Sequence, residues 1–326
     1  MRYIIVTHTD MDGVAAAAIY IYYTASKPER IIFAEPYNIE KKLKKLHNVS
    51  VEKVVIMDMG VNATNIHEVV SIINELVSRG ISIEWYDHHV WDQEWYNKLI
   101  EAGVKLFVDR STCAAGVVAK YCTPSRKDVD EVFVRELVAG VCAGDLWRFD
   151  HWRGPWYMRL VRRGDPTQWR LHVLEKISKG ILWDTEFTEN VTEKIDRELL
   201  SYNIITDKIV QDIVDGIKIA VAPKHDGVET SFAAAYILGR LGADIACIVS
   251  KDGKMSLRSR RVNVREIAKL LGGGGHPRAA GAKIKIPLRV RVIDKFIDGT
   301  SERYVLKTIA NTIKAIGLNK IKLDND

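Results

Sequence analysis

The sequence has only four cysteines among its 326 residues and no apolar run long enough to span a membrane. Because Cys113, Cys122, Cys142 and Cys247 form no Cys-x-x-Cys pair, we expect neither a thiolate zinc site nor a disulfide framework. We interpret all four as reduced thiols. The apolar run at the N-terminus is too short for a signal peptide. These absences predict a cytoplasmic protein without a membrane partner.

The composition is that of a globular protein with a small excess of basic residues. Hydrophobic residues make up 47% and charged residues 28%, which argues against disorder. Lys and Arg together number 48 against 42 Asp and Glu, so the formal net charge is +6. This excess favours an anionic substrate or partner without establishing one. The length suits two domains, each with its own core.

The first half of the chain alternates short apolar runs with helical patterns. The pairs are residues 3–8 with 13–25, 53–60 with 65–80, and 81–89 with a polar turn and helix that follow. Such alternation is typical of a largely parallel sheet with helices on both faces, that is, of an α/β fold.

A second block rich in strands begins near Gly216, and Asp252-Gly253 predicts a hairpin turn within it. Between the two blocks, residues 188–214 contain no Pro or Gly and space their apolar residues as a helix does. We therefore predict a metal-binding domain at 1–187, a helical linker of one or two helices at 188–214, and a smaller mixed α/β domain at 215–326.

Four segments, each interpreted as the end of an apolar strand, end in carboxylates or imidazoles, the ligands that hard divalent metals prefer. They carry His8, Asp10 and Asp12; Asp58; Asp87, His88 and His89; and Asp145. An EF-hand is excluded for the first segment, because the residues after Gly13 offer no oxygen ligands. Taken alone, Asp58 is more simply a helix cap, but the recurrence of the pattern favours a metal site.

The number of these ligands favours two metal ions over one. A mononuclear hydrolytic zinc site needs only three protein ligands. The surplus suits two Mn²⁺ or Mg²⁺ ions about 3.5–4 Å apart that share a carboxylate and promote attack of water on phosphorus.

With these motifs the chain resembles the DHH phosphoesterase superfamily, which includes RecJ-type exonucleases, nanoRNases, cyclic dinucleotide phosphodiesterases and family II pyrophosphatases. The matching motifs are HTDMDG at 8–13, the lone Asp58, DHH at 87–89, and Asp145 in AGDLWRF. The stretch LGGGGHPRAAG at 271–281 resembles the DHH-associated domain. The resemblance covers nearly the whole chain.

The resemblance implies two metal sites that share Asp58. The ligands of the first would be His8, Asp10 and Asp58. The ligands of the second would be Asp12, Asp58, His88 and Asp145. His89 would contact the substrate phosphate or the leaving group, and Asp87 would orient the histidine pair.

The glycine-rich stretch is not a dinucleotide-binding fingerprint. It lacks the Gly-x-Gly-x-x-Gly spacing, and it follows a helical pattern where the fingerprint follows a strand. Its consecutive glycines let backbone N–H groups approach an anion closely. The substrate contacts expected here are Gly273, Gly274, Gly275, His276 and Arg278. Arg258 is a further candidate for a phosphate or base contact.

Four tryptophans lie among arginines in residues 146–170. Such a segment can stack and track single-stranded bases, or its tryptophans can simply pack in a helical core. Both interpretations remain open from the sequence.

We expect a phosphodiesterase with two Mn²⁺ ions, or Mg²⁺ in their place, that cleaves short single-stranded oligonucleotides to 5′-mononucleotides. One alternative is a hydrolase of cyclic dinucleotides or of small bisphosphorylated nucleotides such as pAp. Another is a catalytically silent module that binds nucleic acid or a replication protein, although the intact ligand set argues against it. A homodimer is left open, and the glycine-rich motif disfavours a pyrophosphatase.

Overall fold

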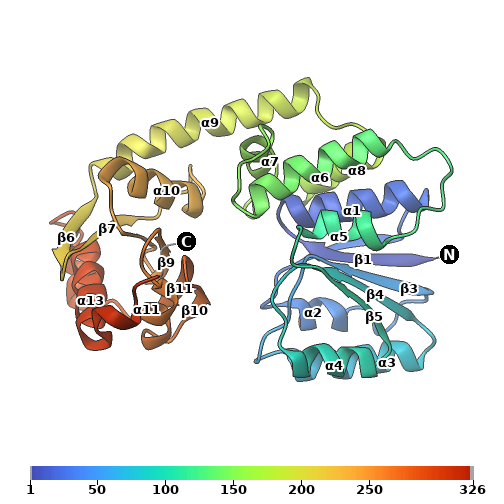
Figure 1. Cartoon of the computed structure of the whole chain (residues 1–326), viewed down its shortest axis with the longest axis horizontal. Helices are drawn as coiled ribbons and strands as arrows, with labels where there is room; N and C mark the ends of the chain where they lie inside the picture. The colour runs from blue at the N-terminus through green and yellow to red at the C-terminus, as the bar shows by residue number, and fades with distance from the viewer. Residues whose placement is uncertain (1, 324–326) are drawn as a thin grey trace. The chain divides into compact units, whose positions relative to one another are not determined.

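The computed structural model describes residues 2–323 of the chain. Two compact units divide it, Met1–Val191 and Thr192–Asp326. Each unit is built around a sheet of its own (Figure 1).

The sheet of the first unit has five strands, all parallel, in the order β2-β1-β3-β4-β5. The strands are β1 (Tyr3–His8), β2 (Arg30–Ala34), β3 (Lys53–Met57), β4 (Ser82–Asp87) and β5 (Val104–Val108). Thr7 pairs with Met57, and Met57 pairs with Tyr86. The carboxyl ends of β1, β3 and β4 therefore meet at one edge of the sheet.

Helices cover both faces of this sheet, as the alternating pattern predicts (Figure 1). On one face lie α2 (Ile39–Lys44), α3 (Ile66–Ser78) and α4 (Gln93–Glu101). On the other face lie α1 (Met11–Thr24) and α5 (Ala114–Tyr121). Both faces are buried, which is why the strands read as continuous apolar runs with little polar alternation. The predicted α/β fold is confirmed.

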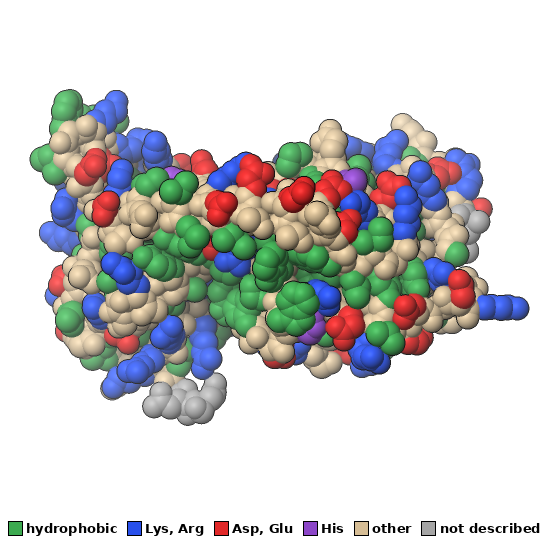
Figure 2. Space-filling view, turned by 90° about the horizontal axis from the view of Figure 1, so that it is seen from above, with side chains coloured by type: hydrophobic (Ala, Val, Ile, Leu, Met, Phe, Trp, Pro, Cys, Tyr) green, Lys and Arg blue, Asp and Glu red, His purple; other side chains and the backbone are tan. Residues whose placement is uncertain are grey.

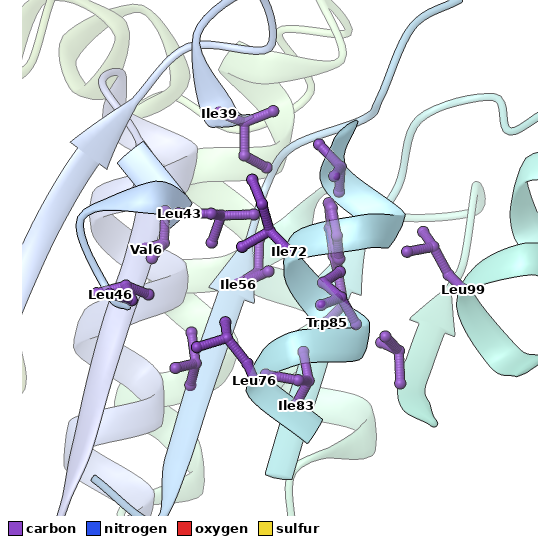
Figure 3. Close-up of a cluster of buried hydrophobic side chains, with 14 of the residues drawn as sticks. Val6, Ile39, Leu43, Leu46, Ile56, Ile72, Leu76, Ile83, Trp85 and Leu99 are labelled. Carbon is purple, nitrogen blue, oxygen red and sulfur yellow. The ribbon is translucent and has the colours of Figure 1, made fainter. Parts of the chain in front are cut away.

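The core between the sheet and α2, α3 and α4 is apolar and closely packed. Figure 3 shows side chains of the strands pointing toward those of the helices, among them Val6, Ile56, Ile83, Trp85, Leu43, Ile72 and Leu76. Trp85 is fully buried, and its indole N–H donates to the carbonyl of Met59 at 2.8 Å. This bond satisfies the polar atom of the largest core side chain and fixes the backbone just beyond β3.

A further helical layer packs on α1 and completes the first unit. It consists of α6 (Glu131–Asp145), α7 (Gly154–Leu160) and α8 (Thr167–Ser178). The four consecutive alanines Ala15–Ala18 of α1 are fully buried, and their small side chains let the neighbouring helices approach closely. α1 is thus a central helix between the sheet and this layer, and it carries the predicted ligands Asp10 and Asp12 at its N-terminus.

The second unit has a mixed six-stranded sheet in the order β10-β11-β9-β8-β7-β6. Its strands are β6 (Val210–Val214), β7 (Ile217–Pro223), β8 (Ile245–Val249), β9 (Lys254–Ser259), β10 (Gly274–His276) and β11 (Ala279–Lys283). Among the strand pairs described in this second sheet, only β7 and β8 are parallel. Gly253, with φ of +82°, closes the β8–β9 hairpin, so the predicted turn at Asp252-Gly253 is confirmed.

Helices complete this unit around a second apolar core. They are α10 (Thr230–Leu241), α11 (Val264–Leu270), α12 (Leu288–Ile293), α13 (Thr300–Ile316) and the 3₁₀ turn η1 (Leu318–Lys320). Fully buried residues of β7, β9, α11 and α13 meet in this core, including Ile219, Leu257, Ile267, Ile309 and Ile313.

The segment between the two sheets is one continuous helix, α9 (Thr185–Thr206). The structure differs from the predicted linker over its last residues, because Val210–Val214 forms the edge strand β6. Asp215 and Gly216, both with positive φ, make the turn from β6 into β7. The apolar residues of Val210–Val214 are spaced so that the sequence alone also fits a continuing helix. Pairing with β7 makes this segment a strand.

The expectation of four free thiols is wrong. Cys113 and Cys142 form a disulfide with their Cα atoms 5.1 Å apart, whereas Cys122 and Cys247 are free and buried. Cys113 directly precedes α5, and Cys142 lies in α6, which packs against it. The two cysteines are 29 residues apart, so their proximity is created by helix packing and leaves no local pattern in the sequence.

None of the helices within residues 2–323 is long and apolar enough to cross a membrane. On the face that Figure 2 shows, basic and acidic side chains both occur, between hydrophobic ones. Basic side chains therefore do not form one continuous positive patch on that face.

Candidate metal centre

The metal-ligating residues predicted in the first unit lie at the carboxyl edge of its parallel sheet. His8 is the last residue of β1, Asp58 follows β3, and His88 and His89 follow β4. Asp10 caps α1 by accepting a hydrogen bond from the Gly13 N–H at 3.3 Å. The two remaining predicted ligands are Asp12, in the first turn of α1, and Asp145, at the end of α6. This edge is where ligands bind in open α/β sheets.

A first cluster joins His8, Asp10 and Asp58, whose ligand atoms lie within 4.8 Å of one another. His8 Nδ1 is 2.8 Å from Asp10 Oδ2 and 3.3 Å from Asp58 Oδ2. His8 Nε2 lies 3.2 Å from Glu35 Oε2, so the ring is held from both sides. These three residues are the predicted first ligand set.

A second cluster joins Asp12, His88 and Asp145 with the same spread of ligand atoms, within 4.8 Å. His88 Nε2 lies 3.7 Å from Asp12 Oδ2, 3.5 Å from Asp145 Oδ2 and 3.4 Å from Asp58 Oδ1. Asp58 therefore turns one carboxylate oxygen toward each cluster. That arrangement is the geometry required of a carboxylate shared by two metal ions.

The oxygen and nitrogen donors of the two clusters fit divalent cations, and a buried oxygen of Asp58 supports this interpretation. Asp58 Oδ2 is buried and has no hydrogen-bond partner among the described residues. The nearest nitrogen, His8 Nδ1, lies closer to Asp10 than to this oxygen. An unpaired buried carboxylate oxygen is costly, and a cation among oxygen and nitrogen donors would satisfy it.

The electrostatics of the cluster also favour cations. Burial raises the pKa of Asp12 well above its usual range, and the charges of Asp58 and Asp145 raise it further. Burial, followed by Asp58 and Asp10, raises the pKa of Asp145 to about 7. Burial alone would lower the pKa of His88, but the carboxylates around it raise this pKa to about 10. The carboxylates repel one another, and a divalent cation between them would relieve that repulsion.

The second histidine of the DHH motif is oriented by the aspartate of the same motif. Asp87 is fully buried, and its Oδ1 lies 2.8 Å from His89 Nδ1. Its other oxygen accepts a hydrogen bond from the Trp91 indole N–H at 2.6 Å. His89 remains 41% exposed, so the opposite edge of its ring is accessible at the site. His89 also lies within ligand distance of Asp58 and His88.

Two features of the centre were not foreseen from the sequence. Glu35, directly after β2, contacts His8 and accepts a hydrogen bond from the Thr9 hydroxyl. The backbone N–H groups of Ala114 and Ala115, at the start of α5, donate to the two oxygens of Asp12 at 2.7 and 2.8 Å. Glu35 could have been found as one more acidic residue after an apolar strand, but backbone donors from residues a hundred positions away leave no signal.

The residues predicted to bind substrate lie in the second unit, on neighbouring strands. His276 pairs with Ala279, and Ala279 pairs with Arg258 of β9. Arg258 donates to the Ser231 and Ser256 hydroxyls at 2.9 and 3.1 Å. His276 and Arg278 are exposed.

Within the glycine-rich stretch, Gly274–His276 forms strand β10 and pairs with β11, so the glycines predicted to approach an anion lie partly in a strand. A Cβ atom at Gly273 would lie 2.0 Å from the Gly281 carbonyl oxygen, and one at Gly275 would lie 2.6 Å from that of Ala279. These two glycines are therefore required for close strand pairing. Gly274 faces open space and is the member of the three with room for a ligand.

A cluster of carboxylates and imidazoles at the carboxyl edge of a parallel sheet, with His8, Asp12 and Asp58 buried, fits the site of a metal-dependent hydrolase. Comparison with known families identifies the family within this class of enzymes. Residues 2–144 match the DHH family, N-terminal domain, and residues 215–302 match the DHHA1 domain. The chain belongs to the DHH phosphoesterases, and it is a hydrolase that depends on divalent metal.

Solved structures also resemble the chain. An uncharacterized protein from Helicobacter pylori aligns over 93% of this chain and 99% of its own, with 19% identity and a TM-score of 0.44. An exopolyphosphatase-related protein from Bacteroides fragilis aligns over 94% of each chain, with 13% identity and a TM-score of 0.49. RecJ from Thermus thermophilus, in complex with Mn²⁺, aligns over 94% of this chain and 52% of its own, with 15% identity and a TM-score of 0.48. The chain thus spans about half the length of that RecJ, and no curated protein matches it.

Proposed function

We propose that the protein is a phosphodiesterase with two Mn²⁺ ions that hydrolyses short single-stranded oligonucleotides to 5′-mononucleotides. The observation that carries this proposal is the carboxylate of Asp58, whose two oxygens face two separate ligand clusters. His8, Asp10 and Asp58 would hold one ion. Asp12, Asp58, His88 and Asp145 would hold the other.

The bound cations would activate a water molecule and neutralise charge on the scissile phosphate. The chain's own part is to place the ligands. α1 presents Asp10 and Asp12 from its N-cap and first turn, and the N–H groups of Ala114 and Ala115 hold Asp12 in place. Because these donors are backbone groups, the orientation of Asp12 depends on the position of α5 and not on a flexible side chain.

His89 is proposed to act on the substrate directly. Asp87 accepts a hydrogen bond from Nδ1, so Nε2 of the 41% exposed His89 side chain is the nitrogen proposed to contact the substrate. Burial lowers the pKa of His89, but the Asp87 carboxylate outweighs burial and raises it. A protonated imidazole can donate to a phosphate oxygen or to the departing hydroxyl.

The second unit is proposed to bind the part of the substrate that is remote from the scissile phosphate. Arg258, His276 and Arg278 supply positive charge and donors on or beside adjacent strands. The proposed contacts also include Gly273, Gly274 and Gly275. We propose residues 1–187 as the metal-binding domain, 188–214 as the connection, whose last residues form strand β6 of the second sheet, and 215–326 as the substrate-binding domain.

A panel assay with Mn²⁺ tests this function. The substrates are labelled RNA and DNA of two to twenty nucleotides, a cyclic dinucleotide and pAp, with Asp58→Ala as the inactive control. We expect kcat/KM to be highest at about two to five nucleotides, because further nucleotides add only screened phosphate contacts. A preference for pAp or the cyclic dinucleotide would reassign the substrate. Turnover by Asp58→Ala above a few per cent of wild type would reject the shared-carboxylate mechanism.

A further inference from the structure

The backbone of the first unit is strained at the metal centre. Among the described residues, five other than glycine have positive φ: Ala25, Asp58, Trp147, Phe149 and Asp215. Ala25 ends helix α1, and Asp215 sits in the β6–β7 turn, where such angles are usual. The other three belong to the metal centre or follow it directly. A bulky side chain in this conformation is a true outlier, and such outliers cluster at functional sites.

Trp147 and Phe149 lie two and four residues after the metal-ligating Asp145. The turn that contains them is held by backbone hydrogen bonds. The Trp147 N–H donates to the Gly144 carbonyl at 3.0 Å, and the Phe149 N–H donates to the Ala143 carbonyl at 2.9 Å. These bonds are available to any residue, and Gly or Asn would adopt the same angles at lower cost. The turn therefore does not explain why aromatic side chains occupy these two positions.

Both aromatic side chains are also partly exposed. Trp147 is 41% and Phe149 37% exposed, and their rings meet edge to face with centroids 4.8 Å apart. In contrast, Trp156 and Trp169 of the same segment pack against Trp183 and Phe187 in an aromatic cluster. Trp147 and Phe149 thus keep exposed ring surface close in sequence to Asp145.

We propose that Trp147 and Phe149 form a stacking platform for the nucleobase of the nucleotide whose phosphate lies at the metal centre. The proposal rests on the proposed function and adds to it the side chains that recognise the base. Aromatic faces stack on bases of any sequence, which suits a nuclease that must accept all of them. Because Asp145 is only two residues away, a phosphate at the metals places its nucleoside within reach of the pair.

Equilibrium binding tests the platform independently of turnover. The probes are AMP and ribose 5-phosphate, which share the phosphate and the sugar but differ in the base. Calorimetric titration in the presence of Mn²⁺ should show tighter binding of AMP by wild type, by about 10- to 100-fold. Trp147→Gly should remove most of this preference and leave the affinity for ribose 5-phosphate unchanged. Trp147→Phe should keep part of it.

A stability measurement separates this role from a structural one. Glycine relieves the strain at position 147, so Trp147→Gly should keep or raise the thermal midpoint while the preference for AMP is lost. Phe296→Ala, in which an 84% exposed ring is removed from the second unit, is the matched control and should keep the preference.

The outcomes distinguish the platform from the proposed function. Equal affinities of wild type for AMP and ribose 5-phosphate would overturn the platform even if oligonucleotides are cleaved. A preference for AMP that Trp147→Gly leaves intact would also overturn it. If wild type cleaves no oligonucleotide and yet shows a preference for AMP that depends on Trp147, the platform stands and the proposed substrate is wrong.

Discussion

Asp58 is the residue on which the account of the metal centre depends. Its sequence context shows only a lone carboxylate after an apolar strand, where a helix cap is the simpler interpretation. In the structure it caps no helix: its φ is +55°, its N–H donates to the Tyr86 carbonyl at 2.9 Å, and its oxygens face two clusters. The candidate ligands could be chosen from the sequence because each ends an apolar run, although the run before Asp145 is helix α6 and not the strand that the sequence indicated. Their support by Glu35 and by the Ala114 and Ala115 N–H groups could not, because it depends on how helices pack.

Gly13 provides a test at the scale of a single residue. A Cβ atom at this position would lie 2.7 Å from the carbonyl oxygen of His8 and 2.8 Å from its nitrogen. Gly13→Ala must therefore displace the backbone that carries a metal ligand. We expect the free energy of unfolding to fall by about 1–3 kcal/mol and Mn²⁺ affinity to fall with it.

Chemical denaturation and Mn²⁺ titration measure the two effects of Gly13→Ala. Gly164→Ala is the control, because a Cβ atom there meets no atom within 4 Å. Unchanged Mn²⁺ affinity in Gly13→Ala would show that the contact with His8 does not position the ligand.

At the scale of elements, the sequence predicted what depends on local pattern and missed what depends on packing. The runs at 3–8 and 53–60 became strands β1 and β3 because their residues are apolar and β-branched, which suits a sheet covered on both faces. The consecutive glycines were predicted only as a place where backbone N–H groups approach an anion, yet pairing with β11 makes Gly274 and Gly275 part of strand β10. The disulfide was missed for a similar reason, since α5 and α6 are brought together only by folding.

The disulfide connects the two elements that position Asp12 and Asp145. Cys113 directly precedes the backbone donors to Asp12, and Cys142 lies three residues before Asp145. It closes a loop of 29 residues, so its removal should lower the free energy of unfolding by about 2–4 kcal/mol. Mn²⁺ affinity should fall as well, because α5 and α6 lose their covalent connection.

Denaturation with and without dithiothreitol checks the disulfide prediction. The reductant should destabilise wild type and leave the double variant Cys113→Ala/Cys142→Ala unaffected. Without reductant, the denatured wild type should show two titratable thiols, those of Cys122 and Cys247. Four titratable thiols would contradict the disulfide.

At the scale of the whole molecule, two units with separate cores divide the chain, and the metal centre lies entirely within the first. The matches to the DHH family N-terminal domain at 2–144 and the DHHA1 domain at 215–302 fall in different units. The class of chemistry could be predicted from the sequence because ligand type and position relative to strands are local properties. The substrate stays a proposal, because it depends on which side chains the fold leaves exposed near the candidate metal site, and Trp147, two residues after Asp145, is 41% exposed.

The number and coupling of bound metal ions test the central claim most directly. Electron paramagnetic resonance of the full chain, titrated with Mn²⁺, both counts the ions and reports whether a shared ligand couples them. We expect two ions per chain with an exchange-coupled signal, because the oxygens of Asp58 face both clusters. The same titration of Asp58→Ala should show that the coupling is lost. Saturation at a single ion, or two ions with no coupling in wild type, would contradict the account.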